Sequence, residues 1–531
     1  MAAVPAVASE AYEAAPITSE PEAAASVTPS QRATLLAAVL IISICALTYE
    51  LIVATLSSYL LGDSVTQFSI TIGFFLFAMG LGALLSRQIR GHEPRWFVVV
   101  ELLTGLFGGI SAALLYGAYT TLNAYYYPIM IGLILAVGIC IGLEIPLLMR
   151  IVASRADLSK ALADVLSVDY IGALIASLSF PLILLPLFGV TQTAFWMGLF
   201  NIGVAAVCLH IFRARIKRGW RLRLWLSTAG IGGLMLAGGI LSVDIVRLFE
   251  SQLYEDVIIY REQSTYQRIV ITRSGEDVRL FLDGNLQFSS RDEHRYHEML
   301  VHPALMAARS RETVVILGGG DGLVAREVLK HADVQRVIVV DLDPAITNLA
   351  QTFPVLRAMN GDAFADPRIE IINTDAYEFI ERSSDVYPVV IIDLPDPNNE
   401  NLSKLYSQQF YRLLLRRLSP DGAFITQATS PYFAREAFWC IANTIQSAGF
   451  QVLPLRAHVP SFGEWGFILG TPRVPPVLRL PEGMPLRYLT PAVLEGGRIF
   501  DPDMAEVPTA VNTLDNPVLP RYYSRAWQQW N

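Results

Sequence analysis

Four aspartates in the second half of the sequence follow four short apolar runs, each at the point where a buried strand would end. They are Asp321, Asp341, Asp375 and Asp393. Because the carboxyl ends of parallel strands meet at one edge of a sheet, these acids would line one crevice. Such a crevice is strongly anionic and suits a ligand that carries positive charge. A single acid after a strand would mean little, since solvated loop acids are common.

Asp321 belongs to a glycine turn, Gly318-Gly-Gly-Asp-Gly322, of the kind that lets a backbone approach a nucleoside closely. The next apolar run ends about twenty residues later at Asp341, where a carboxylate can hold a ribose. A loop built for the phosphates of a dinucleotide would keep a carboxylate away from its ligand. We therefore expect a nucleoside with a cationic group beside it. Intact S-adenosylmethionine fits less well, because its own carboxylate would face Asp321 and Asp393.

The elements that must position these acids alternate between strands and helices. Their predicted bounds are 313–318, 322–331, 335–341, 344–352, 369–373, 388–393, 404–418, 422–427, 433–447 and 450–455. This alternation predicts a Rossmann-like, doubly wound α/β domain with helices on both faces of a parallel sheet. Alternating runs at 257–260, 268–272 and 278–282 predict a small antiparallel β domain before it.

The first half of the chain has a different composition. At 531 residues the chain exceeds the size of a single core. From Leu35 to Val243 it consists of apolar stretches long enough to cross ~30 Å of hydrocarbon. The predicted spans are 34–60, 67–88, 97–119, 127–149, 166–187, 190–212 and 224–244. We expect a multi-span α-helical membrane domain, with the lipid bilayer as its partner.

Three carboxylates fall within or beside these spans: Glu50, Glu144 and Asp169. An ionised group in hydrocarbon costs several kcal/mol unless it is paired or hydrated. Glu50 and Glu144 are candidates for a polar pocket, or alternatively lie near the interface. Asp169 is better explained as an interfacial residue or a helix cap.

The basic residues of the loops are unevenly distributed. They cluster after the second, fourth and sixth spans, in Arg87 to Arg95, Arg150 to Lys160 and Arg213 to Arg223. The positive-inside rule places these loops and the amino terminus in the cytoplasm, and seven spans then put the α/β domain outside.

The predicted organisation has five parts. They are a disordered tail (1–32), the membrane domain (33–246), the β domain (254–300), the Rossmann-like domain (301–471) and an extended carboxy-terminal segment (472–531). The net charge of −8 and the absence of a basic, aromatic-rich patch in the soluble half argue against a nucleic-acid partner. The four cysteines are scattered and show neither metal nor disulfide spacing.

Over about residues 254–470 the sequence closely resembles the polyamine aminopropyltransferases, the spermidine synthase family. The shared motifs are Tyr266-Gln267, Asp283-Gly-Asn-Leu-Gln287, Arg291-Asp-Glu-His-Arg-Tyr-His-Glu-Met-Leu300, Gly318-Gly-Gly-Asp-Gly322, Asp341-Leu-Asp343, Asp375-Ala376, Asp393-Leu-Pro-Asp-Pro397, Leu405-Tyr-Ser-Gln-Gln-Phe-Tyr411 and Gln427-Ala-Thr-Ser-Pro431. They occur in the family's order. The fused multi-span domain is similar to that of a known bacterial branch of the family.

The resemblance implies transfer of the aminopropyl group of decarboxylated S-adenosylmethionine to an amine such as putrescine, giving spermidine and methylthioadenosine. No other cofactor and no metal are expected, and we expect a homo-oligomer. Because the donor is made in the cytoplasm, the resemblance argues for a cytoplasmic catalytic domain, against the charge rule, and we favour the cytoplasmic side.

The resemblance also assigns roles by position. Asp393 would be the proton acceptor, and Tyr296 would help to orient the reacting nitrogen. The nucleoside would be held by Gln267, Asp341, Asp375 and Ala376. The remaining substrate contacts would come from His297, Asp321, Asp396, Gln287 and Gln427.

The sequence departs from the family at the acceptor side. An element whose tyrosine contacts the diamine is shortened to Pro460-Ser-Phe-Gly463, so the donor is better assigned than the acceptor. Two alternatives remain open. One is a methyltransferase-like enzyme that uses S-adenosylmethionine itself. The other is a polyamine transporter or sensor whose soluble domain is not catalytic.

Overall fold

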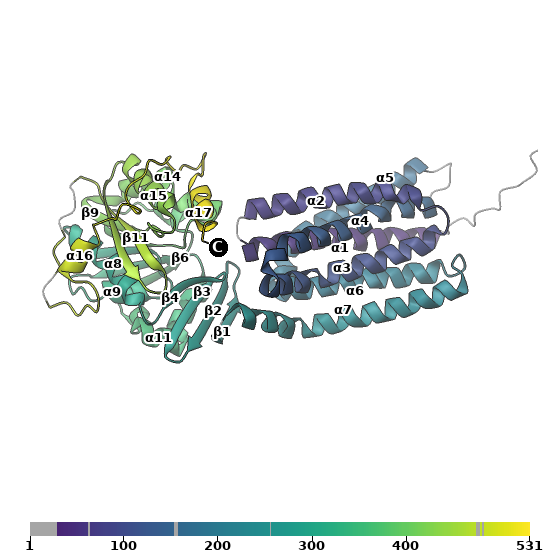
Figure 1. The fold of residues 1–531 in the computed structure, drawn as a ribbon, viewed down its shortest axis with the longest axis horizontal. Coiled ribbons are helices and arrows are strands. Elements are labelled where there is room, and N and C mark those ends of the chain that lie inside the picture. Colours follow the sequence, from purple (N-terminus) through teal and green to yellow (C-terminus); the bar gives the residue numbers. More distant parts are fainter. Residues whose placement is uncertain are drawn as a thin grey trace, which may run out of the picture.

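The computed structural model describes residues 29–61, 64–152, 158–254, 256–473, 478–480 and 483–530. Figure 1 shows two parts, a helical bundle and an α/β part, which lie end to end. Helix α7 (Arg218–Leu253) runs the length of the bundle and leads into the first strand of the α/β part. The predicted tail is too long by four residues, because the first helix begins at Pro29; residues 1–28 lie outside the described chain.

The bundle is built from long apolar helices. Besides α7 these are α1 (Pro29–Leu61), α2 (Ser64–Leu85), α3 (Glu93–Thr121), α4 (Tyr126–Val152), α5 (Leu158–Ser179) and α6 (Leu185–Ile211). By length and composition, six helices in the described part of the chain could cross a membrane, and one of them, Ser159–Ile211, covers both α5 and α6. The sequence predicts two spans in this stretch.

Contacts with α1 show that the chain reverses between α5 and α6. The hydroxyl of Ser43 donates to the carbonyl oxygen of Asp169, and the thiol of Cys45 donates to that of Met197. A continuous helix would hold residues 169 and 197 about 42 Å apart, yet both meet one turn of α1. The break lies at Gly189, which has φ 67° and ψ 176°. The stretch therefore folds as two antiparallel arms.

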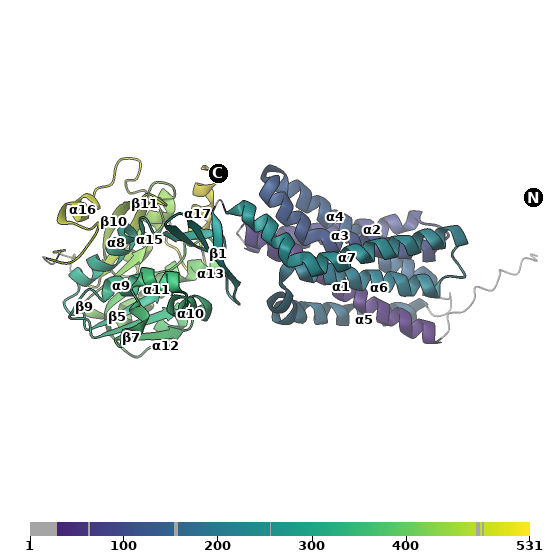
Figure 2. The same ribbon diagram turned by 90° about the horizontal axis from the view of Figure 1, so that it is seen from below.

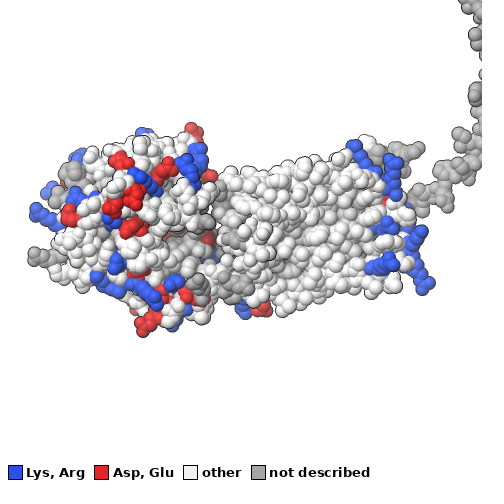
Figure 3. All heavy atoms as spheres, in the orientation of Figure 1, with Lys and Arg blue, Asp and Glu red and all other residues white. Residues whose placement is uncertain are grey.

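Lys and Arg gather at the end of the bundle that is remote from the α/β part (Figure 3). The first turns of α3 and α7 meet there, because the Arg95 guanidinium lies 4.5 Å from the centre of the Trp220 ring. The loops at the other end face the α/β part. The basic loops identified in the sequence thus lie together at one end of the bundle.

A four-stranded antiparallel sheet follows α7. Its strands, in order, are β1 (Val257–Gln263), β2 (Arg268–Ser274), β3 (Asp277–Leu282) and β4 (Asn285–Ser289). The sequence predicts the first three. Strand β4 was not among the predicted runs; it follows Asp283 and Gly284, which form a tight hairpin turn with φ 48° and 78°.

The second sheet has seven strands in the order β10-β11-β9-β8-β5-β6-β7. Their bounds are β5 (Thr313–Gly318), β6 (Arg336–Asp341), β7 (Ile369–Asn373), β8 (Tyr387–Asp393), β9 (Leu418–Gln427), β10 (Gln451–Val459) and β11 (Gly463–Thr471). Strands β5 to β9 pair in parallel, and β11 runs antiparallel to β9 and β10. The doubly wound prediction describes the parallel part, and β11 was missed.

Helices cover both faces of this sheet (Figure 2). They include α8 (Glu293–Ala307), α9 (Leu323–Val328), α10 (Pro344–Thr352), α11 (Pro354–Asn360), α12 (Ala376–Arg382), α13 (Glu400–Ser403), α14 (Gln408–Arg417) and α15 (Arg435–Ser447). Successive side chains of β5 point to opposite faces of the sheet and contribute to an apolar core on each face. Val315 and Leu317 pack into one apolar cluster, and Val314 and Ile316 into the other.

The carboxy-terminal segment, predicted to be extended, contains two helices, α16 (Pro491–Gly496) and α17 (Leu519–Trp527). It is tied to α15: the Trp439 indole donates to the carbonyl oxygen of Met504 and the Arg435 guanidinium donates to that of Ala505. Helix α17 packs on the same helix. The segment is therefore part of the folded α/β unit.

Candidate active site

The candidate site forms where the order of the parallel strands reverses, between β5 and β8. Strand β5 is followed along the chain by β6 on one side, whereas β8 lies on the other side of it. Crevices open at such switch points, outside the carboxyl ends of the strands. The last residues of the two strands, Gly318 and Asp393, are paired there. A Cβ on Gly318 would lie 1.9 Å from the backbone oxygen of Asp393, so only glycine fits.

Asp393 carries a direct hydrogen bond from α8. The hydroxyl of Tyr296 donates to its Oδ1 over 2.6 Å. Burial raises the pKa of Asp393 to about 6; His297 and the Tyr296 hydroxyl oppose the rise, and Asp321 adds to it. A carboxylate with this pKa can accept a proton near neutral pH.

A cation is built into the same cluster. The Nδ1 atom of His297 lies 2.8 Å from a carboxylate oxygen of Glu293, one turn earlier on α8, and Glu293 accepts two bonds from Arg326. Burial disfavours the charged ring, but the Glu293 carboxylate outweighs it and raises the pKa of His297. Burial also raises the pKa of Asp321, and the neighbouring His297 opposes that rise. The acids of the crevice thus surround a histidine that favours its protonated form.

Asp396 marks the other side of the crevice. Burial raises its pKa to about 6, and its polar neighbours Tyr523, Thr429 and Gln427 oppose the rise. The Thr429 hydroxyl donates to Oδ2 over 3.1 Å, whereas Oδ1 is buried without a hydrogen-bond partner among the described residues. Thr429 is held at φ 56°, a strained backbone conformation for a β-branched residue.

The predicted nucleoside residues lie at the ends of β6 and β7. Asp341 accepts hydrogen bonds from the backbone N–H groups of Gly320 and Asp343, and burial raises its pKa to about 6. Asp343 in turn accepts from the side chains of Ser264 and Gln267. The loop between β1 and β2 is thereby fixed against the parallel sheet, which places Gln267 beside this edge.

Asp375 caps α12 and pairs with a lysine. Its Oδ1 accepts from the backbone N–H groups of Tyr377 and Glu378, and its Oδ2 lies 2.6 Å from Nζ of Lys404. Burial opposes ionisation, but Lys404 and the two backbone N–H groups together outweigh it and lower the pKa of Asp375. The next residue, Ala376, is buried at the start of α12.

The two predicted glutamines differ in their surroundings. The Gln427 amide donates to the carbonyl oxygen of Leu394 and to the Tyr406 hydroxyl, both over 2.7 Å, so it fixes the segment that carries Asp396. Gln287 lies on β4 and donates to the carbonyl oxygen of Asn285 on the same strand. The structure brings Asp393, Tyr296, His297, Asp321 and Asp396 into one interacting cluster and leaves Gln287 on its own sheet.

Three residues of the cluster escaped the sequence reasoning. Glu293 and Thr429 stand inside quoted motifs, and the spacing of Glu293 four residues before His297 is a usable helical signal. Tyr523 carries no such signal, because it reaches Asp396 from α17, far along the chain.

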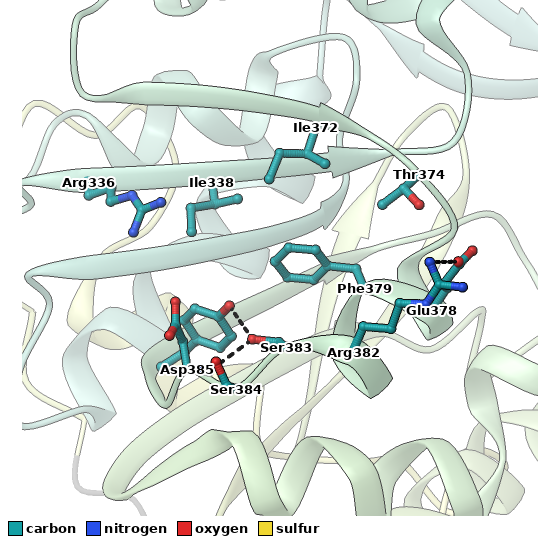
Figure 4. A pocket seen from close by; sticks show the side chains of 11 residues that line it. Arg336, Ile338, Ile372, Thr374, Glu378, Phe379, Arg382, Ser383, Ser384 and Asp385 are labelled. Atoms are coloured by element: carbon teal, nitrogen blue, oxygen red, sulfur yellow. Dashed lines mark hydrogen bonds and ion pairs between the residues drawn. The ribbon is translucent and has the colours of Figure 1, made fainter.

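A separate pocket of about 450 Å³ opens beside β6, β7 and α12 (Figure 4). Arg336, Phe379, Arg382 and Asp385 contribute to its lining. None of the candidate residues named above lines it, and it takes no part in the cluster at Asp393.

Comparisons with known proteins match both parts of the chain. The family model described as spermine/spermidine synthase domain matches residues 293–473. A polyamine aminopropyltransferase of Leptospira interrogans is 44% identical over 493 residues, covering 92% of this chain and 98% of the relative. Polyamine aminopropyltransferase 1 of Streptomyces coelicolor is 44% identical over 515 residues, covering 95% and 96%. The Mycobacterium tuberculosis relative is 40% identical over 514 residues, covering 93% and 97%.

Among solved structures, the chain is similar to spermidine synthase from Thermotoga maritima. The match has 27% identity and a TM-score of 0.43, and covers 46% of this chain and 85% of that one.

Proposed function

The chain belongs to the polyamine aminopropyltransferases, and we propose that this transferase moves the aminopropyl group of decarboxylated S-adenosylmethionine to a primary amine such as putrescine. The products would be spermidine and methylthioadenosine. The observation that carries the proposal is the pair of partly buried acids Asp393 and Asp396, with Tyr296 bonded to the first.

The proposed chemistry is one in-line displacement. The amine arrives as an ammonium, and Asp393 accepts its proton so that the nitrogen gains a lone pair. A C–N bond then forms as the C–S bond breaks, and the bonding electron pair stays on sulfur. The sulfonium group departs as a neutral thioether, so no charged side chain is needed to stabilise the leaving group. Holding both substrates in line supplies much of the rate.

On the donor side, Gln267, Asp341, Asp375 and Ala376 would hold the nucleoside. Asp321, next to the cationic His297, would receive the free ammonium of the donor. A donor that kept its carboxylate would place that group beside Asp321 and Asp393. This favours the decarboxylated molecule.

On the acceptor side, Asp396 offers a buried carboxylate oxygen, Oδ1, that has no hydrogen-bond partner among the residues that the structure describes. The shortened turn before β11 places Phe462 against the Tyr296 ring, with centroids 6.2 Å apart. Phe462 has no hydroxyl that could contact the acceptor. The Tyr523 hydroxyl approaches Asp396 from α17 instead. Its presence supports an acceptor that carries a second amino group, as putrescine does.

The bundle would anchor the enzyme in the bacterial inner membrane. Its basic end lies opposite the α/β part, so the charge rule places the α/β part outside the cytoplasm. We propose the cytoplasmic side, because the reaction consumes a donor that is made there. A reporter fused after Asn531 and active only outside would overturn this placement.

The test of the reaction is product analysis with the purified full chain. Incubated with putrescine and decarboxylated S-adenosylmethionine, it should release methylthioadenosine and spermidine in equal amounts. Formation of S-adenosylhomocysteine from S-adenosylmethionine, without turnover of the decarboxylated donor, would refute the proposal in favour of a methyltransferase. Asp393→Asn serves as the inactive control.

A further inference from the structure

Two carboxylates meet inside the helical bundle, far from the candidate active site. Glu101 of α3 is fully buried, and Glu144 of α4 is 3% exposed. The Asn201 amide of α6 donates to Oε2 of Glu101 over 3.2 Å, and the Thr104 hydroxyl donates to Oε1 of Glu144 over 2.9 Å. The two acids are close enough to interact electrostatically. Three helices thus converge on one pair of acids.

No basic side chain can neutralise this pair from within the spans. The sequence has no Lys, Arg or His from 33 to 86, from 96 to 149, from 161 to 209 or from 224 to 246. The titratable groups that face the pair are themselves acids: Cys45 and Tyr49 of α1, Cys140 of α4, Asp169 of α5 and Cys208 of α6. Two ionised carboxylates here would be unpaired in an apolar environment, which strongly disfavours the charged form.

Among the described residues, the unpaired polar atoms of the cluster include more hydrogen-bond acceptors than donors. Three side-chain atoms are buried without a partner in the described part of the chain: Oε1 of Glu101, Oδ1 of Asn201 and the hydroxyl of Tyr49. The first two can only accept when Glu101 is ionised. A proton on Oε1 of Glu101 removes a charge and supplies a donor to a cluster that holds a free acceptor.

The packing around the pair favours the smallest cation. A Cβ on Gly108 would lie 2.5 Å from the Tyr49 ring, and one on Gly105 would lie 3.1 Å from Cβ of Asn201. These glycines bring α3 into direct contact with α1 and α6. A bound ammonium or metal ion would have to separate the helices, whereas a proton needs no space.

We propose that Glu101 is a proton-binding site of the membrane bundle, held as a neutral carboxylic acid at neutral pH, with Glu144 as the group through which it exchanges. In the exchange, a hydronium ion gives its proton to the carboxylate and leaves water. Glu144 is the more exposed acid and stands six residues before Arg150 on α4, about 9 Å from the basic end of the bundle. The bundle is then a protonatable element, and this inference stands independently of the proposed reaction.

Infrared spectroscopy of the full chain in lipid at neutral pH tests the proposal. The wild type should show the carbonyl band of a protonated carboxyl group in an apolar environment, shifted on exchange into D2O. Glu101→Gln should remove that band, and Glu50→Gln should leave it in place. A wild type without the band at neutral pH, or a band that survives Glu101→Gln, overturns the proposal. So does loss of the wild-type band on addition of putrescine, which would mark an amine site.

Thermal unfolding supplies a second readout. Glutamine is the neutral isostere of a protonated glutamate, so Glu101→Gln should melt at or above the wild-type temperature. The wild-type bundle should lose stability as the pH rises, because ionisation in hydrocarbon is costly, and the variant should lose this dependence. A variant that melts below the wild type at neutral pH would show that Glu101 is ionised, contrary to the proposal.

Discussion

The cluster at the switch point and the cluster in the bundle share several kinds of groups, and a cation is one of the differences between them. Each has a pair of carboxylates, a tyrosine, a side-chain amide and a threonine. In the first cluster these are Asp393, Asp396, Tyr296, Gln427 and Thr429; in the second they are Glu101, Glu144, Tyr49, Asn201 and Thr104. Only the first also contains a cation, His297, held by Glu293. The comparison indicates that a built-in cation favours the ionised form of nearby acids, whereas acids without one favour the protonated form.

The largest effect is expected from removing the proton acceptor. Asp393→Asn keeps the size of the side chain and abolishes its basicity, so kcat should fall about 10³-fold, within the range for general-base catalysis. Methylthioadenosine release measures the rate. Asp421→Asn, at an exposed position, is the matched control and should leave the rate unchanged. A loss below about threefold in Asp393→Asn would show that another group accepts the proton.

Removing the support of the cation should make the first cluster resemble the second. Because Glu293 raises the pKa of His297, Glu293→Gln should lower it and discharge the ring near neutral pH. Without that cation the pKa of Asp393 should rise above its value of about 6. In the wild type, kcat/KM should increase as the pH rises through about 6 and Asp393 ionises. In the variant this rise in kcat/KM should move to higher pH. A shift of one pKa unit should give about a tenfold loss at pH 5, where Asp393 is mostly protonated in both enzymes and one unit changes the ionised fraction about tenfold.

The control for this experiment is an exposed pair with the same chemistry. Glu464 lies 3.0 Å from Nδ1 of His458 at the surface, so Glu464→Gln removes a carboxylate from a histidine outside the cluster. Its pH profile should match that of the wild type. If kcat/KM of Glu293→Gln had the same pH dependence as the wild type, His297 would not affect the pKa of Asp393. The comparison of the two clusters would then be wrong.

The sequence predicts those parts of both clusters that depend on local pattern. The strand ends that carry Asp321, Asp341 and Asp393 follow from apolar runs and turn residues, and the structure has β5, β6 and β8 at these positions. Strand β11 was missed because its pairing with β9 and β10 is decided by distant partners.

Residues that join a cluster only through tertiary packing could not be predicted from the sequence. Glu101 was not singled out, although Glu144 was, because the meeting of α3, α4 and α6 brings them together and no spacing along the chain records it. The same holds for Tyr523, which arrives from a segment predicted to be extended. Burial and pairing of a charged group depend on the assembled fold.

The smallest effect is expected at Tyr523, and it separates binding from chemistry in the first cluster. Tyr523 faces Asp396, whose carboxylate would hold the far amino group of the acceptor, and does not contact Asp393 among the described hydrogen bonds. Tyr523→Phe should therefore raise KM for putrescine about threefold to tenfold, the worth of one hydrogen bond, with little change in kcat or in KM for the donor. The adjacent Tyr522→Phe is the matched control, because the Tyr522 hydroxyl accepts only from the backbone N–H of Ala510 among the described contacts. A fall in kcat with KM unchanged would place Tyr523 in the chemical step, and the acceptor would then need a different anchor.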